Sequence, residues 1–192
     1  QMKENNEQLL NPTAFIQSTH NTVSGQIALQ LKCRAYNLTF SQKSLSFESA
    51  LLDALMVLVQ DGLSSVLVGG LDELTEESFD LMLKAGCARP CSMGKENGEK
   101  GFFAGEGAAF FVLGPEASEK SLARLEAVRM VNQPGGKNGM KQVMIRFLRD
   151  QGLVAEDVDV LITGRNGDAG EEIIYRKLEE DFEQSIILNY KH

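Results

Sequence analysis

Residues 15–29 read FIQSTHNTVSGQIAL, and this stretch decides the fold that we expect. A short apolar run leads into a polar turn, and the turn leads into an amphipathic pattern with helical spacing. We therefore predict a strand over residues 13–17, a tight turn, and a helix over residues 21–36. Many acyl-transfer enzymes present a nucleophile on such a turn, where helix N–H groups favour a developing negative charge. The tip of this turn carries His20, where such an enzyme has Cys or Ser.

Helical and strand-like patterns alternate outward from this stretch. We predict helices over Ser44–Gln60, Glu76–Ala85, Gly139–Gln151 and Glu171–Phe182, and strands over Ser65–Val68, Ala108–Leu113, Ala123–Met130, Val158–Ile162 and Ser185–Asn189. This alternation predicts a layered α/β fold with a mostly parallel central sheet, in which the first two of these strands are buried. Thr75 is the expected N-cap of its helix. The linker signal Pro134-Gly135-Gly136 divides the chain into residues 1–133 and the start of a second α/β half, 134–192.

Length and charge exclude several classes of protein. A chain of 192 residues can bury a real core. Its net charge of −8 argues against nucleic-acid binding and against docking to anionic membranes. No apolar run approaches the roughly 20 residues of a membrane-spanning helix, and the polar start does not resemble a signal peptide. We therefore expect a cytoplasmic protein.

The three cysteines do not form a closed disulfide framework, because their number is odd. Cys33 is expected to lie on a helix and to pack as a small hydrophobic residue. Cys87 and Cys91 form a C-x3-C pair, for which a transient disulfide or two free thiols remain open. A zinc site would need two further ligands, and the sequence contains only two histidines. We predict no metal and no cofactor.

Three further motifs follow the turn in order. The first is GGLDE at residues 69–73, the second is Arg89-Pro90, and the third is GFFAGEG at residues 101–107, which a strand follows. They resemble the GG-x-x-E, RPF and GF-x-x-GEG motifs of the β-ketoacyl synthases, which are condensing enzymes of the thiolase fold; Cys91 replaces the Phe of RPF. The run STHN at residues 18–21 resembles the S-x-H-N run of ketosynthase-like N-terminal domains found beside pigment-polyene gene sets.

This resemblance extends from about Asn11 to His192 and implies a thiolase-like layered α-β-α fold, truncated relative to a full ketosynthase. An elongating ketosynthase uses a Cys and two basic groups, usually His. Here His20 stands at the Cys position, and residues 161–168, expected to bring the first His, contain none. Lys191 matches the family's Lys near the second His. The resemblance thus implies a non-elongating, chain-length-factor-like protein of fatty acid or aryl-polyene-type polyketide biosynthesis.

His20 has two interpretations. It acts as a general base or polarises a bound thioester, which would make the protein an active acyltransferase or decarboxylase. Alternatively, it hydrogen-bonds within the turn and fills the space of the missing thiol, which is the interpretation that we favour. The resemblance also places five residues at the substrate pocket: Ser18, Thr19, Asn21, Phe103 and Glu106. The hydroxyl cluster around the turn is expected to cap a helix, and Glu106 to accept hydrogen bonds from a neighbouring loop.

The resemblance implies partners as well. Members of this family dimerise by antiparallel pairing of the strand before the turn, here residues 13–17, so we expect a homodimer or a heterodimer with a ketosynthase. Acyl carrier protein, which is acidic, would dock through the partner, because this chain is itself acidic.

Overall fold

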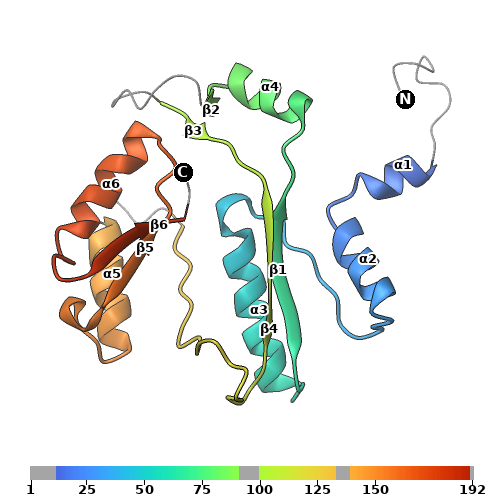
Figure 1. The fold of residues 1–192 in the computed structure, drawn as a ribbon, viewed down its shortest axis with the longest axis horizontal. Helices are drawn as coiled ribbons and strands as arrows, with labels where there is room; N and C mark the ends of the chain where they lie inside the picture. Colours follow the sequence, from blue (N-terminus) through green and yellow to red (C-terminus); the bar gives the residue numbers. More distant parts are fainter. Residues whose placement is uncertain (1–11, 91–99, 133–138, 191–192) are drawn as a thin grey trace. The chain divides into compact units, whose positions relative to one another are not determined.

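The computed structural model describes residues 12–90, 100–132 and 139–190 (Figure 1). The chain forms two compact units. Unit 1 comprises residues 1–68 and 111–118, and unit 2 comprises residues 69–110 and 119–192. The linker signal at residues 134–136 lies outside the described residues, so the predicted division at residue 133 stays a prediction.

Unit 1 is mainly helical. It contains α1 (Pro12–Gln17), α2 (Thr22–Gln30), the short 3₁₀ helix η1 (Lys43–Leu45) and α3 (Ser46–Gln60). Helix α3 confirms the predicted apolar helix and buries Ala54, Val57 and Leu58. The chain leaves α3 through Gly62, whose φ of +62° suits the left-handed conformation common after a helix end.

The strand predicted over residues 13–17 is wrong, because these residues form helix α1. A strand must satisfy its N–H and C=O groups on a neighbouring strand, whereas a helix satisfies them locally. No described residue pairs with residues 13–17 as a strand neighbour. The sequence FIQSTHNTVSGQIAL therefore forms a helix, a turn and a second helix.

Strands β1 (Val66–Asp72) and β4 (Gly107–Leu113) form a two-stranded sheet. In unit 1, β4 meets α3 where the rings of Phe111 and Phe47 lie 6.2 Å apart between centroids. Burial of these strands is less than the sequence predicts. Only Val68 of β1 is buried, and Phe110 and Val112 of β4 are exposed, because the described residues do not cover both faces of this sheet.

Unit 2 contains α4 (Glu76–Lys84), β2 (Ala88–Arg89), β3 (Phe102–Phe103), α5 (Gly139–Asp150), the 3₁₀ helix η2 (Ala155–Asp157), β5 (Val160–Thr163), α6 (Ala169–Glu179) and β6 (Ile186–Asn189). Thr75 caps α4 as predicted, accepting a hydrogen bond from the Ser78 N–H at 3.2 Å. Strands β2 and β3 are parallel, with Arg89 opposite Phe103.

Strands β5 and β6 are also parallel, and α6 connects them. In this β–α–β arrangement Val160 lies opposite Ile186 and Ile162 opposite Leu188. The core of the unit is a cluster of four buried side chains: Leu148, Leu161, Leu178 and Phe182. The predicted α/β alternation is thus present, with the sheet divided among the described residues into three two-stranded pieces.

Two other expectations are wrong. Residues 123–130 form no strand, and none of the described strands pairs with them. Cys33 lies beyond the end of α2 and is an exposed free thiol, as is Cys87. Cys91 lies outside the described residues.

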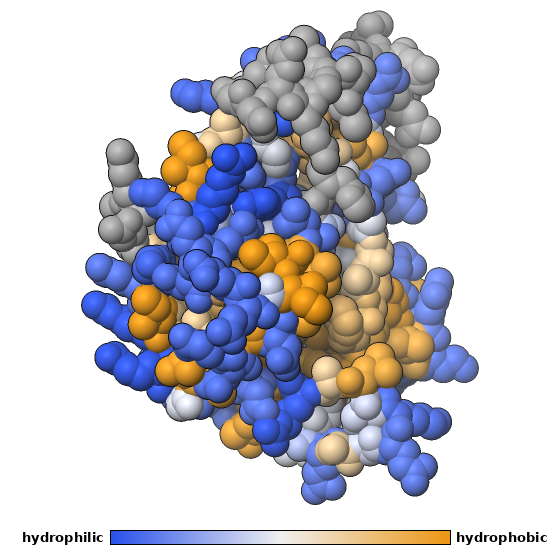
Figure 2. Space-filling view, turned by 60° about the vertical axis from the view of Figure 1, so that its left-hand side comes forward, coloured by the Kyte–Doolittle hydropathy of each residue, from blue (hydrophilic) through white to orange (hydrophobic). Residues whose placement is uncertain are grey.

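Apolar side chains are also found at the surface, where Figure 2 shows them as orange patches among hydrophilic residues. Exposed apolar residues of the chain include Ile162 and Ile186, which are 60% and 63% exposed. In the described part of the chain, no helix combines the length and the apolar character needed to cross a membrane.

Replacing Leu178 by Ala should destabilise unit 2. Leu178 is 6% exposed and belongs to the core cluster, so its truncation should cost about 2–5 kcal/mol of unfolding free energy. Ile173→Ala on the same helix is the matched control, because Ile173 is 59% exposed. Urea unfolding followed by circular dichroism measures both. Equal losses in the two variants would contradict the core described here.

Candidate functional site

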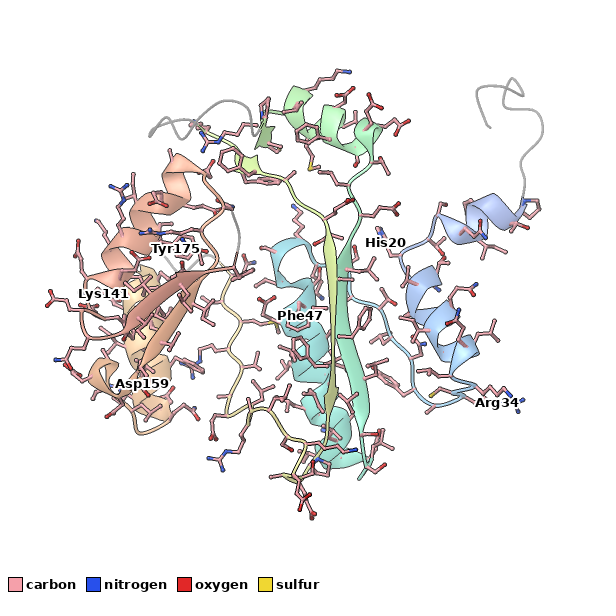
Figure 3. The ribbon with its side chains drawn as sticks, in the orientation of Figure 1. His20, Arg34, Phe47, Lys141, Asp159 and Tyr175 are labelled. Atoms are coloured by element: carbon pink, nitrogen blue, oxygen red, sulfur yellow. The ribbon has the colours of Figure 1, made fainter. Side chains whose placement is uncertain are left out.

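His20 lies in the turn between α1 and α2 and is exposed (Figure 3). Helix α2 begins two residues later, at Thr22, and Asn21 stands at its N-cap position without a side-chain cap. No described residue makes a hydrogen bond or an ion pair with the His20 side chain. The imidazole is therefore neither oriented by a neighbour nor buried as a space-filling group within unit 1.

The hydroxyl groups around His20 bond to the end of α1. Ser18 Oγ donates to the Phe15 carbonyl at 2.7 Å, and Thr22 Oγ1 donates to the Ile16 carbonyl at 2.5 Å. Thr19 Oγ1 lies 2.9 Å from the same Ile16 carbonyl and 2.7 Å from Oδ1 of Asn21. The cluster thus caps a helix, as the sequence predicts, but it caps the C-terminal end of α1. No base among the described residues makes a hydrogen bond with these hydroxyls, as an activated nucleophile requires.

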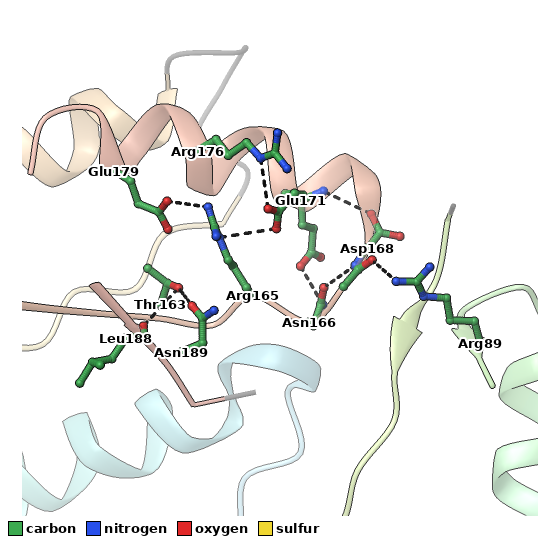
Figure 4. A network of polar contacts seen from close by, with 12 residues as sticks. Arg89, Thr163, Arg165, Asn166, Asp168, Glu171, Arg176, Glu179, Leu188 and Asn189 are labelled. Carbon is green, nitrogen blue, oxygen red and sulfur yellow. Dashed lines mark hydrogen bonds and ion pairs between the residues drawn. The ribbon is translucent and has the colours of Figure 1, made fainter. Parts of the chain in front are cut away.

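A second group of residues, in unit 2, fixes the loop that follows β5 (Figure 4). The Arg89 side chain, 8% exposed, donates from Nη2 to the Gly167 carbonyl at 2.9 Å. The Arg89 guanidinium also lies over the Phe103 ring, 4.2 Å from its centroid, which is a cation–π contact. The Phe103 N–H donates to the Asn166 carbonyl at 2.9 Å. Strands β2 and β3 therefore hold residues 166 and 167 through both backbone and side chain.

Asp168 completes this arrangement, which we call the Asp168 clamp: Arg89, Gly101, Phe103, Asn166, Gly167 and Asp168. Its Oδ2 accepts the Gly101 N–H at 2.7 Å, and its Oδ1 accepts the N–H groups of Gly170 and Glu171 at the start of α6. The Gly101 hydrogen bond is the main cause that lowers the pKa of Asp168 below its ordinary value of 3.8. The carboxylate stays ionised at neutral pH and serves as a helix cap rather than a proton donor.

Residues 161–168, where the resemblance places a catalytic His, contain a single basic side chain, Arg165. Arg165 Nη2 contacts Oε2 of Glu179 at 2.5 Å, and Arg165 Nε lies 3.5 Å from Oε2 of Glu172. Thr163 Oγ1 lies 2.5 Å from Oδ1 of Asn189 at the end of the neighbouring strand. The one cation of this segment is therefore held by two carboxylates of α6.

Glu106 follows β3 and accepts the Leu74 N–H at 3.2 Å through Oε2. This is the hydrogen bond from a neighbouring loop that the sequence predicts for Glu106. Its carboxylate is exposed, and the bond joins the residues after β1 to those before β4.

The predicted site residues lie in two groups. His20, Ser18, Thr19 and Asn21 share one turn of unit 1, whereas Phe103 and Glu106 belong to unit 2. Asp168 was not among the predicted site residues, although Asp followed by Ala-Gly-Glu at a helix start is a typical capping pattern. Assignment of the two groups to a substrate pocket remains a prediction.

Comparison with known proteins adds to this geometry. The family model described as "Beta-ketoacyl synthase, N-terminal domain" matches residues 4–100, which is half of the chain. The chain belongs to this family. No curated protein matches it in sequence.

Solved structures show that this β-ketoacyl synthase family member has the thiolase-like fold. Similar structures are the ishigamide ketosynthase/chain length factor, a β-ketoacyl synthase from Burkholderia phymatum STM815, and the ketosynthase from module 6 of the bacillaene synthase from Bacillus subtilis 168. Their TM-scores are 0.67, 0.66 and 0.63, and their sequence identities are 16%, 18% and 19%. The matches cover 91%, 98% and 94% of this chain, but 48%, 51% and 37% of those chains. The chain therefore spans about half the length, or less, of these structures.

Gly167→Ala should disrupt the Asp168 clamp. Gly167 has a φ of +87°, and an added Cβ would lie 2.7 Å from Cδ2 of Phe103. Gly152→Ala is the matched control, since Gly152 has a φ of +73° and open space around it. Because overpacking adds to the shared backbone strain, Gly167→Ala should lose about 1–3 kcal/mol more stability than the control. Urea unfolding measures this difference, and its absence would show that the clamp is not closely packed.

Asp168 should make stability depend on pH in the acid range. Because its pKa is lowered in the folded chain, its contribution is complete above the ordinary value of 3.8 and is lost as pH falls through the lower folded value. Asp168→Asn should therefore flatten the curve of unfolding free energy against pH below about pH 4. Asp159→Asn is the matched control, because it removes an exposed aspartate of the same unit. A slope that is the same in wild type and Asp168→Asn would refute this role.

Proposed function

We propose that this chain is a non-elongating ketosynthase-like subunit that pairs with a complete ketosynthase and helps to set product length. Among the similar structures, one is a ketosynthase/chain length factor, and that likeness agrees with such a role. We further propose that the protein is cytoplasmic and acts in aryl-polyene-type biosynthesis. The proposal keeps the domain boundary at residue 133.

The observation that carries the proposal is that neither basic side chain expected to act in catalysis, His20 or Arg165, is arranged as a catalytic base. The whole sequence contains two histidines, His20 and His192. His20 has no orienting partner among the described residues, and a general base needs one. Arg165, the basic residue of the segment that should bring a catalytic His, is held by Glu179 and Glu172.

The side chain at residue 20 also argues against elongation by this chain. A thiolate attacks a thioester and stores the acyl group as a new thioester, whereas imidazole transfers acyl groups without holding them stably. A covalent elongation cycle on His20 would therefore lose its cargo to water. A role beside an active enzyme does not require such storage.

Exposed apolar side chains support the need for a partner. Phe15 and Ile16 of α1 are 65% and 62% exposed, next to the turn that carries His20. Large apolar patches on soluble proteins commonly mark interaction sites. Since residues 13–17 are helical in this chain, pairing through an antiparallel strand would require α1 to unfold first, and contact through its apolar side chains would not.

The acidic charge of this chain suggests that acyl carrier protein docks on the ketosynthase partner. The chain carries a net charge of −8, and acyl carrier proteins are acidic. Like charges slow association and disfavour contact, so the ketosynthase partner would supply the basic docking patch.

The test measures where an acyl group is attached. The full chain is co-expressed with a ketosynthase from the same genome that carries the active-site Cys, and the purified complex is incubated with an octanoyl thioester. Mass spectrometry with peptide mapping should find the octanoyl group on the active-site Cys of the ketosynthase and none at His20 of this chain. His20→Cys should gain an octanoyl group at residue 20, because a thiol then stands at the tip of the turn.

Asn21→Cys is the matched control, placing a thiol one residue away on the same exposed turn. Peptide mapping separates both from the native thiols at residues 33, 87 and 91. Octanoyl attached at His20 of the unmodified chain would overturn the proposal. So would identical product lengths from the ketosynthase with and without this chain.

A further inference from the structure

A cavity of about 210 Å³, partly open to solvent, lies in unit 2 between helices α5 and α6. Its lining is almost entirely apolar and includes Met144 and Leu148 of α5, together with Leu178 and Phe182. All the lining residues fall within residues 141–182, so the cavity is built by this unit alone. It is separate from the Asp168 clamp and from the turn that carries His20.

The volume limits what the cavity can hold. An engineered protein cavity of about 150 Å³ stays free of water and binds benzene, whereas sites for drug-sized ligands measure about 300–1,000 Å³. This cavity lies between those values. It therefore suits a small flexible apolar group, such as one alkyl chain, rather than a nucleotide or a multi-ring ligand.

The charged residues that line the cavity favour a negatively charged head group on the ligand. Lys141 and Asp181 also line the cavity, and they neutralise each other through an ion pair of 2.6 Å between Nζ and Oδ1. Arg149, an exposed lining residue, makes no ion pair with any described residue. Its neighbour Asp150 is engaged by Arg129 at 2.7 Å.

Arg149 stands in the last turn of α5, where the helix end carries about half an elementary negative charge. This partial charge does not cancel the full positive charge of the guanidinium. An apolar cavity with one uncompensated guanidinium is complementary to a ligand that has an alkyl chain and an anionic head.

We propose that this cavity binds a medium-chain fatty carboxylate, with the alkyl chain between α5 and α6 and the carboxylate at Arg149. The guanidinium presents a planar fork of N–H donors that matches a carboxylate. The site goes beyond the proposed function, because it involves neither His20 nor a partner chain.

The test is a calorimetric titration of the full chain with sodium decanoate, below the concentration at which decanoate forms micelles. Wild type should bind one decanoate per chain. Arg149→Glu should weaken decanoate binding at least tenfold, because it places a carboxylate beside the ligand head. Arg146→Glu is the matched control on α5, since Arg146 is exposed and does not line the cavity; it should change affinity less than threefold.

Two further arms locate the ligand. Decanol, which has the same alkyl chain without the charge, should bind wild type and Arg149→Glu equally. Ile145→Trp puts a large side chain at a lining position that is 49% exposed, and it should abolish decanoate binding. The sequence has no other Trp, so the fluorescence of the new residue confirms that this variant is folded.

No saturable decanoate binding by wild type would overturn the proposal while leaving the proposed function untouched. Equal weakening in the two arginine variants would remove the assignment of the carboxylate to Arg149. Unchanged binding in a folded Ile145→Trp variant would place the ligand elsewhere.

Discussion

The arrangement of unit 2 depends on one carboxylate. Asp168 accepts a hydrogen bond from Gly101, which is 67 residues away in sequence, and two more from the first turn of α6. Hydrogen bonds to an ionised acceptor are about twice as strong as neutral ones, so this carboxylate joins the β2–β3 pair to the helix between β5 and β6. Gly167 has a positive φ and lies so close to the Phe103 ring that a larger side chain would not fit there. The Asp168 contacts therefore fix the end of this loop at the start of α6.

Two arginines, Arg89 and Arg165, are also held at the loop between β5 and α6. A buried guanidinium is costly unless its donors and its charge are satisfied. Arg89 meets part of this need through the Gly167 carbonyl and the Phe103 ring, and Arg165 does so through two glutamates. Each charge that stabilises the loop is one that is not available to a substrate. Arg89 and Arg165 therefore stabilise the loop between β5 and α6.

Sequence patterns predicted the features that depend on near neighbours. The helix over Ser46–Gln60, the cap at Thr75 and the parallel strands on either side of α6 follow from periodicity and from residues a few positions apart. Features that depend on distant partners were predicted less well. Residues 13–17 have strand-like composition, but they are helical because no described strand pairs with them. The role of Asp168 was visible in part, since its capping pattern is local, whereas its bond to Gly101 is not.

The sheet formed by β5 and β6 has one apolar face that the described residues leave uncovered. Leu161 and Thr163 alternate inward and are buried, while Val160 and Ile162 face away and are exposed. The register places Ile186 and Leu188 beside these outward residues, so four apolar side chains share one open face. Parallel sheets are almost always covered on both faces, because water cannot solvate such a surface without cost. The described part of unit 2 covers one face only. Any polypeptide that completes this layer must bring apolar side chains to the other face, and the same requirement applies to the exposed side chains of β4.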